Sequence, residues 1–429
     1  MKATIFDRLE SEVRSYVRSF PTVFCQAQGC WLTDEAGKRY LDFFAGAGSL
    51  NYGHNHPALK SKLLTYLDAD GIVQGLDMAT GAKRAFMETF ERLILVPRQM
   101  SYKLQFTGPT GTNAVEAALK LARLKKQRET IICFTNAFHG VSAGAVAATG
   151  HRKFREAVGI PLEHTRFMPY AGYFGSNVST LAILEKQLQD PSSGLDHPAA
   201  ILVETVQGEG GLNSASRQWL RGLSDLCKRH DMLLIVDDIQ MGCGRTGTFF
   251  SFEESGINPD IIVLSKSLSG YGLPMSLLLL KPHLDIWEPS AHNGTFRGNN
   301  AAFVTATAAL QEFWRDEQFS DQIQEKGRLL RNRLRRLQRR QPLIQEVRGR
   351  GMIAGLVLEN GEQTSRITEL CFQRGLILES CGPHGEVLKM MPPLIVTDKE
   401  LETGLDILEA SLGELQAELE AGTKREMSA

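Results

Sequence analysis

Two charged residues stand at the ends of two apolar runs, and their side chains suit one reaction. Lys266 follows Ile261-Ile-Val-Leu264 after a single serine, and Asp237 directly follows Met232-Leu-Leu-Ile-Val236. In an α/β protein, ligands bind at the carboxyl ends of parallel strands. A lysine amine can bond to the aldehyde of pyridoxal phosphate, and an aspartate can keep the pyridine nitrogen of that cofactor protonated. The pair therefore predicts a pyridoxal-phosphate site, although a lone lysine at a strand end is more often a surface cation.

Three other segments are suited to holding such a cofactor. The turn 108–113, rich in glycine and threonine, leads into a helical pattern and would present free N–H groups to a phosphate, or would be an ordinary helix start. Phe138 could stack on a flat ring or cap the core, and His139 could move a proton or fill a polar gap in the interior. The turn around Thr295 offers donors for a second phosphate contact. None of these three segments identifies a cofactor site by itself.

A further acid at a strand end, Glu204, follows the run 199–203. It would be either a buried acid satisfied by hydrogen bonds or a group that pairs with a cation and so controls access for substrate carboxylates. Gln240 lies three residues beyond Asp237 and adds an amide to the same predicted edge.

The elements that must position these residues are predicted from the periodicity of the chain. Helical segments alternate with five apolar runs that read as strands, which predicts an α/β fold with a mostly parallel sheet covered on both faces. The runs are 131–134, 199–203, 232–236, 261–264 and 275–280. Residues 24–44 have the pattern of a small antiparallel unit, and long helices follow residue 300. We therefore predict a large domain over 52–300 and a smaller α+β domain formed by 1–51 and 301–429.

Composition limits the classes of partner. The net charge is −1, which gives no reason to expect nucleic acid or an anionic membrane, and the basic stretch 331–340 fits the solvated face of a helix. The seven cysteines form no C-x-x-C pair, so reduced thiols in the cytoplasm are expected rather than disulfides or a metal site. The amino terminus lacks a long apolar stretch, and no membrane segment is predicted.

Taken together and in this order, the segments resemble the class III (ω-type) aminotransferases of the fold type I pyridoxal-phosphate family, over essentially the whole chain. The resemblance implies that family's α/β fold, pyridoxal 5'-phosphate as cofactor and an active unit that is at least a homodimer. It also assigns roles: Gly111 and Thr112 to the phosphate, Phe138 to the ring face, Asp237 to the pyridine nitrogen, Gln240 to the phenolic oxygen, Lys266 to the covalent bond, and Thr295 to the phosphate of the neighbouring subunit.

Four longer stretches, 44–54, 70–78, 134–140 and 265–274, are similar to one subgroup of that family, the diaminobutyrate–2-oxoglutarate transaminases of ectoine synthesis. Many class III members carry an arginine for the α-carboxylate of glutamate in the segment that here contains Lys389. A lysine keeps the charge but loses the two-pronged hydrogen bonding of a guanidinium. The resemblance attributes this lysine to the subgroup.

The expected reaction moves the amino group of L-glutamate to L-aspartate 4-semialdehyde in a ping-pong cycle, giving L-2,4-diaminobutyrate and 2-oxoglutarate. Lys266 would move the proton, and Glu204 would pair with Lys389 until a glutamate carboxylate displaces it. Several alternatives remain open: an ω-aminotransferase for ornithine, 4-aminobutyrate or acetylornithine, a glutamate-1-semialdehyde aminomutase, and diaminobutyrate supply to a siderophore. A non-catalytic binding protein has no need of Lys266, Asp237 and Gln240 together.

Overall fold

Seven strands form the largest sheet, in the order β4-β10-β9-β8-β7-β5-β6. The structure is a computed structural model that describes residues 4–426. Strands β5 to β9 are parallel to one another, whereas β10 runs antiparallel to both β4 and β9. The bounds are β4 Lys103–Phe106, β5 Ile131–Phe134, β6 Thr165–Met168, β7 Ala200–Val203, β8 Leu233–Asp237, β9 Ile261–Leu264 and β10 Leu277–Leu280.

Both faces of this sheet are buried, which is why its central strands are continuous apolar runs. Along β5, for example, Ile131 and Cys133 belong to one core cluster with helix α6 (Gly111–Lys126), whereas Ile132 and Phe134 belong to the other. The five strands predicted from apolar runs are confirmed, with ends shifted by no more than two residues. Strands β4 and β6 were not predicted, because polar residues such as Gln105 and Arg166 interrupt their apolar pattern.

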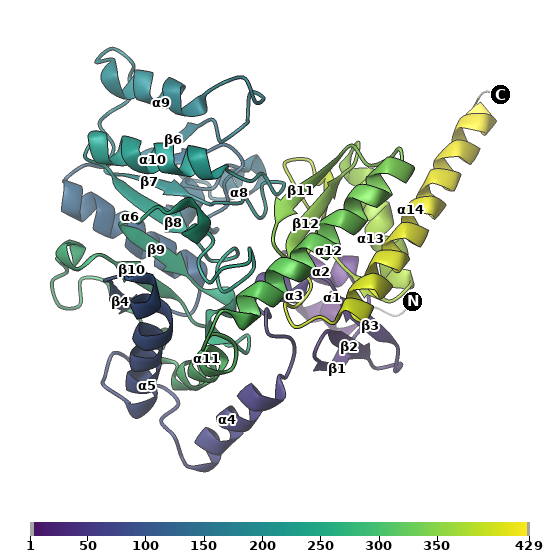
Figure 1. Cartoon of the computed structure of the whole chain (residues 1–429), viewed down its shortest axis with the longest axis horizontal. Helices are drawn as coiled ribbons and strands as arrows, with labels where there is room; N and C mark the ends of the chain where they lie inside the picture. Colours follow the sequence, from purple (N-terminus) through teal and green to yellow (C-terminus); the bar gives the residue numbers. More distant parts are fainter. Residues whose placement is uncertain (1–3, 427–429) are drawn as a thin grey trace.

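Two smaller sheets are built from the flanks of the chain. In the first, the order is β1-β2-β3-β13, and β13 pairs in parallel with β3, so the two ends of the chain share one sheet. The second is antiparallel, with the order β11-β12-β15-β14. Figure 1 shows these sheets on one side of the molecule, beside both termini, together with α12 (Gln318–Arg340), α13 (Gly361–Gln373) and α14 (Asp398–Glu426). The strands are β1 Phe24–Gln28, β2 Trp31–Asp34, β3 Arg39–Asp42, β11 Glu346–Arg350, β12 Ile353–Val357, β13 Leu376–Ile377, β14 Glu379–Cys381 and β15 Val387–Met390.

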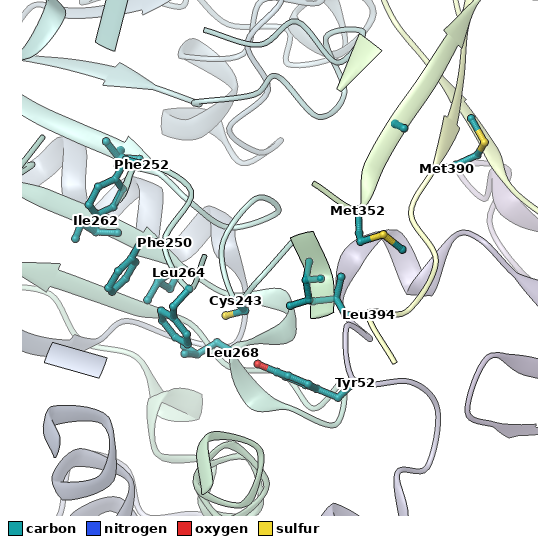
Figure 2. Packing of buried hydrophobic residues seen from close by; sticks show 14 of the residues in the cluster. Tyr52, Cys243, Phe250, Phe252, Ile262, Leu264, Leu268, Met352, Met390 and Leu394 are labelled. Atoms are coloured by element: carbon teal, nitrogen blue, oxygen red, sulfur yellow. The ribbon is translucent and has the colours of Figure 1, made fainter. Parts of the chain in front are cut away.

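The antiparallel unit predicted over 24–44 is present as β1 to β3. The division into a domain of 52–300 and one made of both flanks stays a prediction. Figure 2 shows buried side chains running from Ile262 and Leu264 on β9, past Cys243 and Leu268, to Met352 and Leu394 of the carboxyl-terminal part. One hydrophobic cluster therefore joins the large sheet to the flanks.

Helices cover the sheets and connect them. Helix α6 contacts β7 to β10 of the large sheet, and α11 packs on α4 and α5. Among residues 4–426, no helix is long and apolar enough to cross a membrane. The α-helices are α1 Ile5–Leu9, α2 Tyr16–Ser19, α3 Ala45–Gly48, α4 Pro57–Asp68, α5 Gly81–Phe90, α6 Gly111–Lys126, α7 Ala143–Ala147, α8 Arg152–Glu156, α9 Thr180–Gln189, α10 Arg217–Arg229, α11 Asn300–Phe313, α12 Gln318–Arg340, α13 Gly361–Gln373 and α14 Asp398–Glu426.

A fully buried arginine, Arg245, on the loop after β8, ties these parts together. Its guanidinium donates to the carbonyls of Met352, at 2.9 Å, and Pro392, at 2.6 Å, and to Oδ1 of Asn51, also at 2.6 Å. The backbone N–H of Asn51 in turn donates to Oγ of Ser267, the residue after Lys266. The lysine predicted to react is therefore fixed by contacts that come from both flanks of the chain.

Candidate active site

A cavity of about 360 Å³ opens at the carboxyl ends of β7, β8 and β9. Eight of the ten predicted site residues line it, from five separate segments of the chain. The two that do not are Lys389, which lies behind the cavity wall, and Thr295, which is exposed on the short helix η6 (Thr295–Gly298). The eight are Gly111, Thr112, Phe138, His139, Glu204, Asp237, Gln240 and Lys266.

Lys266 is held in a strained conformation at the end of β9. Its φ of 50° lies in the left-handed region, which a lysine rarely adopts and which costs of order 1–3 kcal/mol. Its Nζ donates to the carbonyl of Ala47 at 2.8 Å, in a turn where φ of residues 45–48 is also positive. Burial lowers the pKa of the Lys266 ammonium below its usual value. A lower pKa increases the fraction of neutral amine, the form that attacks a carbonyl.

Asp237 and His139 form a buried pair on another wall. Nδ1 of His139 lies 2.7 Å from Oδ2 of Asp237, and the N–H of Ile239 donates to Oδ1 of Asp237 at 3.1 Å. Burial lowers the pKa of His139, but the hydrogen bond and charge of Asp237 raise it by more, so it lies above its usual value. The histidine thus keeps the aspartate oriented.

The Glu204 carboxylate accepts hydrogen bonds from the backbone of the cavity wall. It accepts from the N–H of Phe138 and from the N–H of Gly208, each at 3.1 Å. Burial raises the pKa of Glu204 to about 7, against the opposing effect of the His139 charge. This geometry matches the first of the two predicted interpretations, a buried acid satisfied by hydrogen bonds.

The predicted pairing of Glu204 with Lys389 is wrong for this structure. Nζ of Lys389 lies 2.8 Å from Oε1 of Glu209 and 2.9 Å from Oε1 of Glu379. The physical reason is that two backbone N–H groups already occupy Glu204, whereas strand pairing places Glu379 opposite Lys389. Glu209 also accepts from Nε2 of Gln240 at 3.2 Å and lines the cavity.

Neither Glu209 nor Glu379 was predicted from the sequence as a site residue. Glu209 belongs to the same stretch as Glu204, and nothing in the local pattern separates the two acids. Glu379 directly follows the apolar run Leu376-Ile-Leu378, and an acid that ends a buried run is a signal of the same kind as Asp237. The reasoning that identified Asp237 would therefore also have identified Glu379.

The start of α6 provides a cradle of backbone N–H donors. Gly111 and Thr112 occupy the first turn, where N–H groups have no partner within the helix and the helix dipole favours an anion. Gly140 packs against them with φ of 119°, and a Cβ there would lie 2.5 Å from Oγ1 of Thr112. Only glycine permits this close approach.

These donors and acceptors fit pyridoxal phosphate. The cavity combines an amine, a carboxylate for a ring nitrogen, an aromatic side chain at Phe138 and a helix start suited to a phosphate. Two buried polar atoms also lack partners, Oε1 of Gln240 and Nε2 of His139. Because unpaired buried polar atoms are costly, their presence at the cavity supports a polar ligand there.

The chain matches the family model Aminotransferase class-III over residues 13–412. A diaminobutyrate–2-oxoglutarate transaminase of Bordetella parapertussis is 60% identical over 420 residues, 97% of each chain. One from Halomonas elongata is 53% identical over 415 residues, 96% of this chain and 99% of that protein. The solved ornithine aminotransferase of Toxoplasma gondii, with pyridoxal phosphate at partial occupancy, has a TM-score of 0.82 and 26% identity, covering 96% of this chain and 94% of its own.

The cradle at α6 gives a direct prediction. Gly140→Ala should weaken the binding of pyridoxal phosphate by ~10-fold or more, about 1.4 kcal/mol, because the new Cβ displaces Thr112 and the backbone is strained. Titration of the apoenzyme with the cofactor, followed by absorbance, measures this. Gly172→Ala is the matched control, since φ there is also positive but nothing lies within 4 Å of the new Cβ. Equal affinity in the two variants would show that Gly140 has no part in the cradle.

Proposed function

The chain belongs to the class-III aminotransferase family, and from this we propose that it transfers the amino group of L-glutamate to L-aspartate 4-semialdehyde, giving L-2,4-diaminobutyrate and 2-oxoglutarate. The enzyme uses pyridoxal 5'-phosphate. Relatives that are 53–60% identical carry the name of that reaction. The observation that carries the proposal is a buried lysine, Lys389, neutralised by an acid of the cavity wall, Glu209.

Charge matching explains why that pair suits these substrates. Glutamate and 2-oxoglutarate each bring two carboxylates, whereas diaminobutyrate and aspartate semialdehyde each bring one. With Glu209 on Lys389, the side of the ammonium that faces the cavity is occupied, and the wall accepts the substrates that have one carboxylate. When Glu209 turns away, that side of the Lys389 ammonium can hold the extra carboxylate of glutamate. One cavity can then serve both halves of the cycle.

The residues of the cavity divide the chemical work. Bound pyridoxal phosphate supplies an electron sink for the substrate carbon. We assign Nζ of Lys266 to anchor the cofactor at rest and then to take the proton from the substrate carbon that carries the amine. Asp237, oriented by His139, holds a proton at the ring nitrogen. Glu204 fixes the backbone of Phe138, so that its ring lies along the cavity.

Thr295 is assigned to the cavity of a second subunit. It lies on the surface beside Phe296, whose side chain is 65% exposed. The segment 72–78 is held next to it by hydrogen bonds from Gly75 to Gly298 and from Asn300 to Val73. The exposed apolar side chains gathered there support burial in a homodimer, since large exposed patches of this kind mark interfaces. They are Ile72, Val73, Leu76, Met78 and Phe296.

We further propose that the enzyme works in the cytoplasm, in the first step of ectoine synthesis. All seven cysteines are free thiols and six are buried, which suits a reducing compartment. The relatives' shared name gives the transamination that this first step requires. Supply of diaminobutyrate to a siderophore would use the same reaction.

The function is tested by single-turnover reactions with a panel of amino donors. We expect L-glutamate and L-2,4-diaminobutyrate to convert the cofactor at least ~10-fold faster than L-ornithine or 4-aminobutyrate, measured by the loss of cofactor absorbance. Glutamate should release 2-oxoglutarate, which an aminomutase would not do. Lys266→Ala is the control and should show no conversion with any donor. A preference for ornithine or 4-aminobutyrate would reject the proposed substrates.

Replacing Glu209 tests the pairing with Lys389. Glu209→Gln removes the carboxylate that occupies the cavity side of Lys389 in both half-reactions, while Glu379 remains beside the lysine. We expect kcat/KM for diaminobutyrate to fall ~10-fold or more, about 1.4 kcal/mol, relative to that for glutamate. Stopped-flow measurement of each half-reaction gives the two values. Glu346→Gln, an exposed acid outside the cavity, is the control. Equal losses for both substrates would show that Glu209 does not discriminate between them.

The assignment of Thr295 is tested with mixed dimers of two inactive variants, Thr295→Ala and Lys266→Ala. If Thr295 acts across the interface, one site of each mixed dimer has both an intact Lys266 and an intact Thr295. Mixing after dissociation should then give each mixed dimer up to about half of the specific activity of the wild-type dimer, because one of its two sites is intact. The absence of any restored activity would place Thr295 in the site of its own subunit.

A further inference from the structure

Lys389 has a second carboxylate partner, which the reaction described above does not use. Glu379 lies directly opposite Lys389 in the antiparallel pairing of β14 with β15, and its Oε1 is 2.9 Å from Nζ. The Lys389 side chain has no exposed surface. The lysine is therefore held between two acids, one on a loop and one on a neighbouring strand.

The two acids differ in their freedom to move. The Glu209 side chain is 34% exposed, lies on the loop after β7 and lines the cavity. That of Glu379 is only 9% exposed, and its backbone belongs to β14. A side chain on a loop at a cavity can rotate, whereas one fixed by strand pairing cannot follow it. If Glu209 turns away to admit a carboxylate, Glu379 stays beside the lysine.

A lysine at this position needs such a partner. A buried ammonium without a carboxylate loses its proton readily, whereas an arginine keeps its charge. Burial lowers the pKa of Lys389, and the charges of Glu209 and Glu379 raise it well above its usual value. The other ionisable groups that affect this cluster are Cys381, Lys266 and Tyr16. None of these three is a carboxylate, so none can replace Glu209 when it leaves.

Glu379 can respond to the departure of Glu209. Burial raises the pKa of the Glu379 carboxyl to about 7, Lys389 lowers it, and the charge of Glu209 raises it. Once Glu209 moves off, that repulsion is removed and Glu379 ionises more readily. The carboxylate also borders a second cavity, of about 630 Å³, whose lining shares no residue with the first.

We propose that Glu379 is a positioning residue that keeps the Lys389 ammonium charged and in place while Glu209 moves off, so that a lysine can receive the carboxylate of a dicarboxylic substrate. The proposal rests on the proposed function, because it assumes that glutamate and 2-oxoglutarate bind this cavity. A lysine can then bind a substrate carboxylate where an arginine would be better suited, because a fixed acid on the adjacent strand keeps the lysine charged.

The test uses the holoenzyme with Glu379→Gln, which keeps the shape but removes the charge. We expect KM for glutamate to rise ~10-fold or more relative to that of the wild-type enzyme. The difference should become larger between about pH 7 and about pH 9, because without Glu379 the Lys389 ammonium loses its proton when Glu209 leaves. KM for diaminobutyrate should change less than about 3-fold, since Glu209 then stays on the lysine. Glu369→Gln, an acid that lines the same second cavity without contact to Lys389, is the control.

A second variant provides the rescue. In the Glu379→Gln, Lys389→Arg double variant, the guanidinium stays charged without a carboxylate, so KM for glutamate should match that of Lys389→Arg alone and should not depend on pH in this range. This comparison also serves if Glu379→Gln does not accumulate as folded protein. Equal losses for both substrates, a loss independent of pH, or no rescue would each overturn the role of Glu379. A wild-type enzyme that converts neither substrate would instead reject the proposed function.

Discussion

The charge of a buried ammonium must be balanced by carboxylates, and this constraint at Lys389 determines how the active site is built. An uncompensated charge in a dry interior costs several kcal/mol, so the strand that carries Lys389 needs acids within contact distance. One of them, Glu379, comes from the adjacent strand, and the other, Glu209, from the loop after β7. The backbone agrees with this arrangement, since the N–H of Gly382, just after β14, donates to the carbonyl of Glu209. The ion pairs thus join the small antiparallel sheet to the wall of the cavity.

The site exists only when both flanks of the chain have folded onto the large sheet. Lys266 and Asp237 come from its central strands, but Ala47, which accepts from Lys266, and Lys389 lie more than a hundred residues away in either direction. Arg245 fixes this assembly through carbonyls of the carboxyl-terminal part and through Asn51. The left-handed backbone at Lys266 and at residues 45–48 is kept in place by these contacts.

The sequence predicted those features that follow from local pattern. Lys266 and Asp237 were identifiable because each follows an apolar run, and parallel strands bring such ends to one edge. The partner of Lys389 was not predicted correctly. Whether Glu204, Glu209 or Glu379 meets it depends on how β14 pairs with β15 and on which acid is already occupied by backbone N–H groups. Those are properties of the folded chain, and β4 and β6 were missed for a similar reason, since burial there tolerates polar residues.

The most direct measurement is a crystal structure of the holoenzyme with bound glutarate, a dicarboxylate that has no amine to react. If Lys389 receives the extra carboxylate, one carboxylate of the ligand contacts Nζ of Lys389, Glu209 has turned out of contact, and Glu379 remains beside the lysine. A structure in which glutarate occupies the cavity while the contact between Lys389 and Glu209, 2.8 Å here, stays intact would show that Lys389 does not receive a substrate carboxylate.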